Sequence, residues 1–354
     1  MHPNSTICFV AGRSGGHIVP ALTLAQQHKK KHPHDTVMFI TTNTALDKKI
    51  LERNPTIDHS YYCALDTLPG KNIFRYPRFA CDLVQTIILC TKILCRHKPH
   101  AIISTGGYIA LPVCIAAWFM RIPVTLYELN ALPGRATRAL APCAKTIACC
   151  FEEALKFFPS AKACYAPYPI RFEQPSLHNT PLPEHFSAQR KTILVIGGSQ
   201  GSRFINTLID QWLKQTHLHD AMQIIHQTGM AHIQHCRQLY AHHRIPAVIF
   251  DYHDDLQHYY QCADLVICRS GAGSLFETLF FKKRCITIPL ETATTDHQVY
   301  NAQACARAYP DLVTVMKEAE LAKNPLLLDT YIQELIGSTM PQPHSAAATQ
   351  SLSE

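Results

Sequence analysis

The chain alternates short, unbroken apolar runs with longer segments whose apolar residues recur at helical spacing. The short runs are rich in β-branched residues and are often followed by Gly or Pro, which is typical of strands that helices cover on both faces. Repeated alternation of such strands with helices predicts parallel sheets in an α/β fold. The expected strands are residues 7–11, 37–41, 101–104, 124–128, 146–150, 193–196, 223–227, 248–250, 265–268 and 285–289.

This pattern breaks near the middle of the chain. Residues 165–191 contain five prolines, and the sequence TILVIGGSQGS then restarts the strand–turn–helix pattern of the opening TICFVAGRSGGH. A length of 354 residues suits two domains of about 150 residues each. We therefore expect two doubly wound, Rossmann-like domains, residues 1–168 and 169–336, with a cleft between them. Residues 337–354 are poor in apolar side chains and are expected to form a disordered tail.

Composition narrows the possible classes of partner. Lys and Arg together number 33 against 26 Asp and Glu, a net charge of +7. This excess suits an anionic membrane or a phosphorylated substrate, and no helix-turn-helix, RRM or zinc-finger signature points to nucleic acid. The fifteen cysteines contain no C-x-x-C pair, and the N-terminus has no secretory signal pattern. Free thiols in a reducing cytoplasm are therefore expected.

Three glycine-rich turns follow expected strands: GRSGGH at 12–17, STGGY at 104–108 and GGSQGS at 197–202. Glycine lets a ligand approach the backbone, and the start of the next helix offers unpaired N–H groups. A single turn of this kind could be purely structural, but three favour a phosphate-bearing ligand. The dinucleotide spacing G-x-G-x-x-G and the P-loop pattern are both absent.

A fourth segment, ADLVICRSGAGSLFE at 263–277, ends a strand in small residues and begins a helix. The amides of this helix start could hold a diphosphate. Glu277 could accept two hydrogen bonds from a ribose diol, or it could simply be an acid favoured by the helix dipole. The residues expected at the helix start are Ala272, Gly273, Ser274 and Leu275.

Taken together, these segments resemble the MurG family, bacterial UDP-GlcNAc:lipid I N-acetylglucosaminyltransferases of peptidoglycan synthesis. The resemblance implies the glycosyltransferase B fold, UDP-GlcNAc and lipid I as substrates, and inverting transfer to the muramoyl 4-hydroxyl without cofactor or metal. It spans residues 5–305 and rests on GRSGGHIVPAL (12–22), STGGYIALP (104–112), YELNALPGRATRALAP (127–142), YPIR (168–171), IGGSQGSRFIN (196–206), CRSGAGSLFE (268–277) and DHQVYNA (296–302).

The resemblance also implies roles for individual residues. His17 is the candidate general base, because histidine titrates near neutrality, although it could instead cap its turn or bind phosphate. Glu128 is the second candidate, as base or as a residue that orients the acceptor. Donor contacts are implied for Ser14, Gly15, Gly16, Asn130, Arg171, Ser199, His253, Ala272, Gly273, Ser274, Leu275, Glu277 and Gln298, and an acceptor or phosphate loop for Gly106, Gly107 and Tyr108. The chain departs from the family's pattern at Arg13, Ser14 and Leu129.

A lipid acceptor requires a surface that faces the membrane. Residues 71–98 contain six basic side chains and one acid, with aromatic residues interleaved at the start, which suits the interface of an anionic leaflet. We expect residues 83–95 to pack as a helix on their own sheet and the protein to lie peripherally on the cytoplasmic face of the cell membrane. The expected membrane patch consists of Lys71, Ile73, Phe74, Arg75, Arg78 and Phe79.

Other functions remain open at this point. A UDP-GlcNAc 2-epimerase or a different lipid glycosyltransferase would share the fold, and a complex of cell-wall synthesis is a candidate partner. An inactive scaffold of the division machinery is less favoured, because His17, Asn130, Glu277 and Gln298 are all present.

Overall fold

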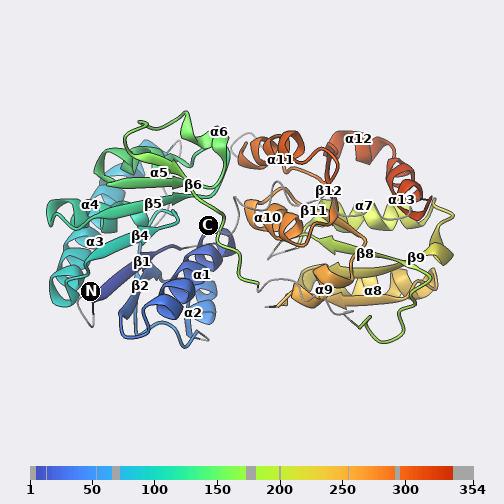
Figure 1. Ribbon diagram of the computed structural model, residues 1–354, viewed down its shortest axis with the longest axis horizontal. Helices are drawn as coiled ribbons and strands as arrows, with labels where there is room; N and C mark the ends of the chain where they lie inside the picture. Colours follow the sequence, from blue (N-terminus) through green and yellow to red (C-terminus); the bar gives the residue numbers. More distant parts are fainter. Residues whose placement is uncertain are drawn as a thin grey trace. The chain divides into compact units, whose positions relative to one another are not determined.

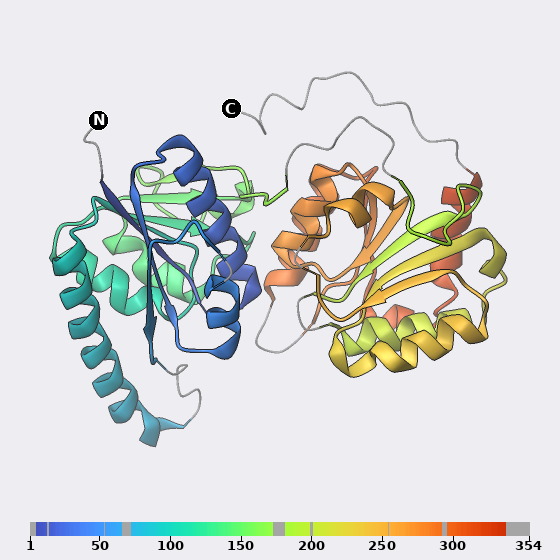
Figure 2. The ribbon, with the colours of Figure 1, turned by 90° about the horizontal axis from the view of Figure 1, so that it is seen from below.

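The computed structural model describes residues 5–12, 14–52, 54–65, 72–172, 181–198, 201–253, 255–291 and 296–337. The chain divides into two compact units, Met1–Arg171 and Phe172–Glu354. In each unit a parallel sheet lies between layers of helices (Figure 1, Figure 2). The expected fold class, α/β with two Rossmann-like domains, is confirmed. Residues 338–354 of the expected tail lie outside the described part of the chain.

Within the described residues, the sheet of the first unit has the strand order β3-β2-β1-β4-β5-β6-β7, and all neighbouring strands run parallel. The order reverses between β1 and β4, and open α/β sheets bind ligands outside the carboxyl ends of strands at such a reversal. The strands are β1 (Thr6–Val10), β2 (Thr36–Thr42), β3 (His59–Cys63), β4 (Ala101–Ser104), β5 (Val124–Glu128), β6 (Thr146–Cys149) and β7 (Ala163–Tyr165).

Helices cover both faces of this sheet, which explains the unbroken apolar runs. On β1, Ile7 and Phe9 pack with residues of α1 and α2, whereas Cys8 and Val10 pack with residues of α3, α4 and α5. Every side chain of the strand's last four residues is therefore buried. The helices are α1 (Gly15–Lys31), α2 (Ala45–Glu52), α3 (Tyr76–His97), α4 (Ala110–Phe119), α5 (Arg135–Leu140) and α6 (Glu152–Leu155).

The sheet of the second unit repeats this plan, with the order β10-β9-β8-β11-β12-β13 and parallel neighbours in the described residues. Its reversal lies between β8 and β11, and its main core joins the sheet to α7, α8, α12 and α13. The elements are β8 (Lys191–Ile196), α7 (Arg203–Leu213), β9 (Met222–Gln227), α8 (Ile233–His242), β10 (Ala247–Phe250), α9 (Gln257–Cys262), β11 (Leu265–Cys268), α10 (Ala272–Phe280), β12 (Arg284–Thr287), α11 (His297–Ala308), β13 (Val313–Val315), α12 (Glu318–Lys323) and α13 (Leu327–Gly337).

All ten expected strands are present, and the structure adds β3, β7 and β13. Each added strand lies at an edge of its sheet. An edge strand pairs on one side only and is partly open to solvent, so it lacks the continuous apolar run of a central strand. In β3, for example, the first two residues are exposed and only the last is buried.

Helix α3 differs from the expectation in two respects. Phe79 is buried, so its side chain does not belong to a membrane-facing surface, whereas Val84 and Ile88, expected to pack on the sheet, are exposed. A helix of 22 residues is about 33 Å long, and the four-residue strand β4 after it covers only about 13 Å. The first turns of α3 therefore extend past the strands, as Figure 2 shows.

A buried hydrogen-bond network connects β9 to two helices of the second unit. Asn206 Nδ2 donates to the Thr228 carbonyl oxygen at 2.9 Å, which leaves its Oδ1 to accept from His226 Nε2 at 3.1 Å. His226 Nδ1 then accepts from the Tyr240 hydroxyl at 2.7 Å. Burial lowers the pKa of His226 to about 3, because the imidazolium would lose its hydration. The folded protein thus holds this histidine neutral.

This network predicts a pH-dependent stability. Between pH 6.5 and 3, His226 takes up a proton in the unfolded chain but stays neutral in the folded protein. The free energy of unfolding that depends on His226 is therefore greatest above about pH 6.5. It declines by about 1.4 kcal/mol per pH unit as the pH falls. Urea unfolding in a Trp118→Phe background, followed by the fluorescence of buried Trp212, measures this slope. His226→Gln should flatten the slope, and the exposed control His235→Gln should keep it. Equal slopes in all three proteins would contradict the assignment.

Candidate functional site

The two glycine turns of the first unit pack against each other at the strand reversal. One follows β1 and the other follows the neighbouring strand β4. Gly107 has φ +86°, and a Cβ atom on it would lie 2.9 Å from the Gly12 carbonyl oxygen. A side chain at this position would therefore strain the backbone and collide with the neighbouring turn. Tyr108, the next residue of this loop, is half-buried.

The helix after the first turn begins without a side-chain cap. Ser14 is the N-cap of α1 in extended conformation, and its side chain makes no capping hydrogen bond. Gly15 and Gly16 form the first turn of the helix, and Gly16 is exposed. Uncapped N–H groups at a helix start favour an anion. Arg13 lies outside the described residues.

His17 lies in the same helical turn, beside the turn after β4. Its Nδ1 is 2.8 Å from the Thr105 carbonyl oxygen, and its own carbonyl accepts from Thr105 Oγ1 at 2.8 Å. Because a carbonyl oxygen can only accept, Nδ1 carries the proton and Nε2 is the basic nitrogen of the neutral ring. A Cβ on Gly106 would lie 3.2 Å from His17 Cε1, so glycine there makes room for the ring. His17 is half-buried, and its Nδ1 contact with the Thr105 carbonyl fixes the orientation of the ring.

Glu128 ends β5, the next strand along the sheet from β4, and is buried. Its Oε1 accepts from the amide and side-chain nitrogens of Asn130 at 3.0 and 3.3 Å, and its Oε2 accepts from the Gly134 amide at 3.0 Å. Both oxygens thus hold the loop between β5 and α5. This arrangement favours a role for Glu128 in placing Asn130 over a role as a base.

The glycine turn of the second unit is packed as tightly as those of the first. Gly201 has φ +76°, and a Cβ on it would lie 2.3 Å from the Thr228 carbonyl oxygen. Ser202 then caps α7 by accepting from the Ile205 amide at 3.3 Å. Ser199, expected beside the diphosphate, lies outside the described residues.

Helix α10 begins at the reversal of the second sheet, directly after β11, which pairs with β8. Gly271 is its N-cap and has no side chain to satisfy the amides of Ala272, Gly273 and Ser274, whereas the expected contact at Leu275 is not supported, because its amide already donates to the Gly271 carbonyl at 3.1 Å. The positive end of the helix dipole adds to the attraction for a phosphate group. Glu277 lies one turn further on, is 9% exposed, and accepts from the Tyr260 hydroxyl at 3.2 Å.

A buried arginine at this reversal, Arg269, is absent from the residues expected from the sequence. Arg269 Nε donates to Ser202 Oγ at 3.0 Å, and its Nη1 contacts the Ile288 carbonyl at 3.2 Å and Glu318 Oε1 at 2.6 Å. It thereby joins the turns after β8 and β12 to the start of α12. The sequence feature that could have identified it is a charged residue between a buried strand and a turn of small residues. A charge in such a buried position requires partners in the folded chain.

The remaining expected donor residues are placed separately. Gln298 lies in the first turn of α11 and accepts from the Leu290 amide at 2.9 Å. His253 is exposed in the loop after β10, and its ring lies edge-on to Phe250 and Tyr259. Arg171 is half-buried and is the last residue of the first unit.

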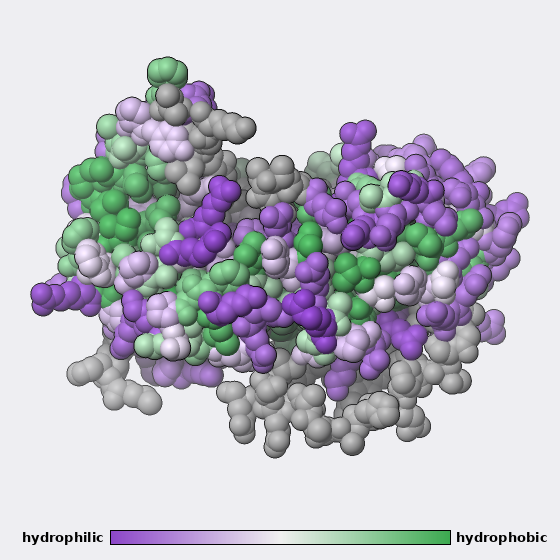
Figure 3. Space-filling view, turned by 90° about the horizontal axis from the view of Figure 1, so that it is seen from above, coloured by the Kyte–Doolittle hydropathy of each residue, from purple (hydrophilic) through white to green (hydrophobic). Residues whose placement is uncertain are grey.

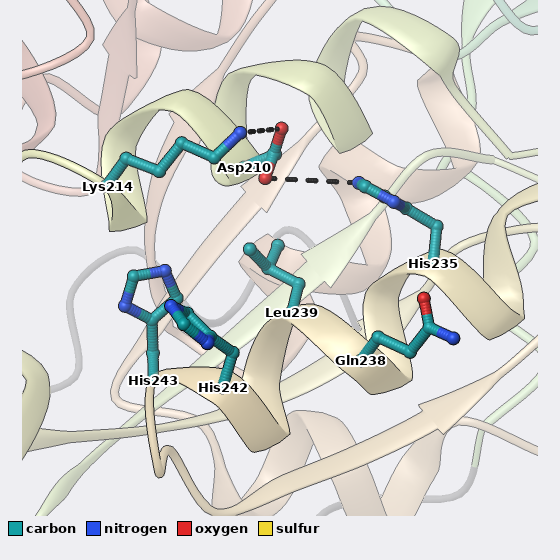
Figure 4. A pocket seen from close by; sticks show the side chains of 7 residues that line it. All are labelled: Asp210, Lys214, His235, Gln238, Leu239, His242 and His243. Carbon is teal, nitrogen blue, oxygen red and sulfur yellow. Dashed lines mark hydrogen bonds and ion pairs between the residues drawn. The ribbon is translucent and has the colours of Figure 1, made fainter.

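A surface groove in the second unit lies away from all of these residues. It runs between α7 and α8 and is lined by Asp210, Lys214, His235, His242 and His243, among others (Figure 4). Asp210 bonds Lys214 Nζ at 2.8 Å and lies 3.9 Å from His235 Nε2. The groove reaches the C-terminal ends of both helices, where Lys214 and His243 lie. In a parallel α/β unit these ends lie at the amino edge of the sheet, opposite the edge that binds ligands.

Two Rossmann-like units, each with one helix start at its strand reversal that no side chain caps, define the class of the protein. Residues 7–149 match the glycosyltransferase family 28 N-terminal domain, and residues 192–352 match the corresponding C-terminal domain. The crystal structure of MurG from Acinetobacter baumannii shares the fold, with a TM-score of 0.71 and 23% identity over 95% of this chain and 91% of that one. The protein is a glycosyltransferase of family 28.

Sequence relatives define the group more narrowly. A protein of Myxococcus xanthus is 33% identical over 90% of this chain and 82% of its own length, and one of Trichlorobacter lovleyi is 30% identical over 84% and 82%. Both carry the name UDP-N-acetylglucosamine–N-acetylmuramyl-(pentapeptide) pyrophosphoryl-undecaprenol N-acetylglucosamine transferase. The chain belongs to this family, the MurG family, as its motifs indicate.

The contacts of Glu128 lead to a test by substitution. In Glu128→Gln the side-chain NH2 group faces a backbone N–H that donated to the carboxylate, so one hydrogen bond is lost. This loss should destabilise the loop between β5 and α5 by about 1–3 kcal/mol. Hydrogen exchange of the peptide covering residues 129–134 should be faster, whereas Glu52→Gln, a change at an exposed carboxylate of the same unit, should leave it unchanged. Unchanged exchange in Glu128→Gln would show that the carboxylate does not hold this loop.

Proposed function

We propose that this protein transfers GlcNAc from UDP-GlcNAc to the muramoyl 4-hydroxyl of lipid I, which yields lipid II for peptidoglycan. The main support is the 33% identity, over 90% of the chain, with a relative that carries this activity in its name. The site geometry agrees in kind, since both units present helix starts suited to phosphate groups.

The second unit binds the donor in this proposal. The first-turn amides of α10 hold the diphosphate, and Ser199 is a further proposed contact of the diphosphate. Glu277 accepts from the ribose hydroxyls, and His253 borders the uracil. Gln298 binds GlcNAc hydroxyls through its amide group. The start of α10, where the N-cap residue Gly271 has no side chain to bind the amides, is the main structural support.

The first unit supplies the base and the acceptor contacts. The muramoyl O4 attacks the anomeric carbon while the bond from that carbon to the UDP oxygen breaks, so the configuration inverts. His17 Nε2 takes the hydroxyl proton, and the electron pair of the broken bond leaves with UDP. The start of α10 and Arg171 stabilise the charge that develops on the diphosphate, so the step needs no metal. Asn130, placed by Glu128, contacts the sugar, and the loop of Gly106, Gly107 and Tyr108 borders the acceptor.

A membrane-facing surface completes the proposal, because the acceptor carries a polyprenyl chain. Phe74 is 88% exposed, and Arg75 and Arg78 beside it are also exposed. Apolar side chains gather over α3 and α4 (Figure 3), where the exposed members are Val84, Ile88, Leu89, Trp118 and Phe119. Cationic and apolar side chains on one pair of helices suit an anionic leaflet.

This membrane surface differs from the expected patch. The exposed residues of α3 and α4 replace buried Phe79. Lys71 lies outside the described residues, and of Ile73 only the backbone is described. No described helix combines the length and apolar character needed to span a bilayer. We place the protein peripherally on the cytoplasmic face of the membrane.

Replacing the proposed base tests the chemistry. His17→Ala should lower kcat by about 10²–10⁴, the usual contribution of general-base catalysis. The assay follows radiolabelled GlcNAc from UDP-GlcNAc onto a lipid I analogue in the presence of EDTA. His34→Ala, at an exposed histidine of the same unit, should retain full activity. A loss under about tenfold in His17→Ala would remove His17 from the role of base.

Charge reversal tests the membrane surface. Arg75→Glu/Arg78→Glu should weaken binding to anionic vesicles at low salt by about 30-fold or more, because each basic residue near the surface contributes about 1 kcal/mol. Co-sedimentation with phosphatidylglycerol vesicles measures this, and Lys30→Glu/Lys31→Glu at the end of α1 is the charge-matched control. Equal binding by both double variants would place the membrane contact elsewhere.

A further inference from the structure

A fully buried tyrosine contacts the carboxylate proposed to bind the ribose. Tyr260 lies on α9, and its hydroxyl is 3.2 Å from Glu277 Oε2 on α10. The phenol is neutral near pH 7 and the carboxylate can only accept, so the tyrosine is the donor. Tyr260 is not among the expected site residues, because a tyrosine on a helix resembles an ordinary residue of the hydrophobic core.

Aromatic packing fixes the position of this hydroxyl. The Tyr260 ring stacks on Phe281 with centroids 5.2 Å apart and an interplanar angle of 9°, and Phe172 meets it edge-on at 5.9 Å. Phe172 also contacts Phe281 at 5.4 Å, so the three rings form one cluster. A ring held on two sides has little freedom to move its hydroxyl group. Glu277 therefore receives a hydrogen bond from a rigid donor.

We infer that Tyr260 is a positioning residue for nucleotide recognition, which orients the Glu277 carboxylate so that it accepts from the ribose diol of the donor. This inference rests on the proposed binding of a uridine diphosphate sugar by the second unit. An ionised carboxylate offers about four acceptor positions, and the tyrosine occupies one of them. The hydrogen bond also fixes the rotation of the carboxylate before the ligand arrives, which lowers the ordering cost of binding.

A purely structural role for Tyr260 gives a different expectation. If the hydroxyl served only to satisfy a buried carboxylate, its removal would destabilise the unit and weaken every nucleotide to the same degree. If it orients Glu277, the loss depends on the ribose hydroxyls of the ligand. Tyr260→Phe separates the two roles, because phenylalanine keeps the ring cluster and removes only the hydroxyl.

The test measures the affinities of the full-length protein for UDP and for 2′,3′-dideoxy-UDP by calorimetry. Tyr260→Phe should weaken UDP binding about three- to tenfold, the range of one hydrogen bond, and dideoxy-UDP binding by less than about twofold. In a Glu277→Gln background the same change should have no further effect on UDP. Tyr331→Phe, which removes a hydroxyl from a partly buried tyrosine on α13, should bind both ligands like the wild type.

Each outcome of these binding measurements supports or overturns the positioning role of Tyr260. Equal weakening of both ligands by Tyr260→Phe, or additive effects of the Tyr260 and Glu277 substitutions, would overturn the positioning role. Unchanged UDP affinity in Tyr260→Phe would also overturn it. Failure of the wild type to bind UDP would instead refute the proposed function itself. Thermal melting of each variant shows whether the fold is retained. If Tyr260→Phe is unfolded, Glu277→Gln is tested in its place. If Glu277→Gln prefers UDP over dideoxy-UDP as strongly as the wild type does, the inference is overturned.

Discussion

The close approach of backbone to backbone between neighbouring turns at the carboxyl edge of each sheet is the constraint on which this structure depends. In the first unit Gly107 lies against the Gly12 carbonyl, and in the second Gly201 lies against the Thr228 carbonyl. Both glycines have positive φ, so the chain turns sharply from strand to helix at the carboxyl edge of each sheet. This geometry places the starts of α1 and α10 at the carboxyl edges of their sheets, where open α/β sheets bind ligands.

Buried polar side chains hold these turns in place. Glu128 accepts from the loop that carries Asn130, Arg269 joins three segments around α10, and His226 links β9 to α7. Each is satisfied by hydrogen bonds or an ion pair, as burial of a polar group requires. The candidate site thus consists of backbone amides and a few side chains, and buried polar residues hold the loops that carry them. Tyr260 and Glu277 form a further buried pair of this kind, joined by a hydrogen bond from the tyrosine hydroxyl to the carboxylate.

Much of this organisation was predictable from local pattern. A strand covered on both faces must be apolar throughout, so the central strands could be located, and glycine turns after them indicated the ligand edge. Edge strands such as β3 lacked that signal because half of their surface is open to solvent. On α3, helical spacing alone could not distinguish buried Phe79 from exposed Val84, since both occur in one amphipathic sequence.

By itself, then, the sequence determined the fold class, the two-domain plan and the family, because these follow from periodicity, glycine spacing and motif order along the chain. Only the tertiary structure decided which nitrogen of His17 is basic and that Glu128 holds a loop. It also revealed that Arg269 contacts Ser202 and Glu318 and that the Tyr260 hydroxyl donates to Glu277. The reason is physical: those properties depend on partners distant in sequence, such as the Thr105 carbonyl for His17, and no local pattern specifies which groups the folded chain brings within hydrogen-bond distance.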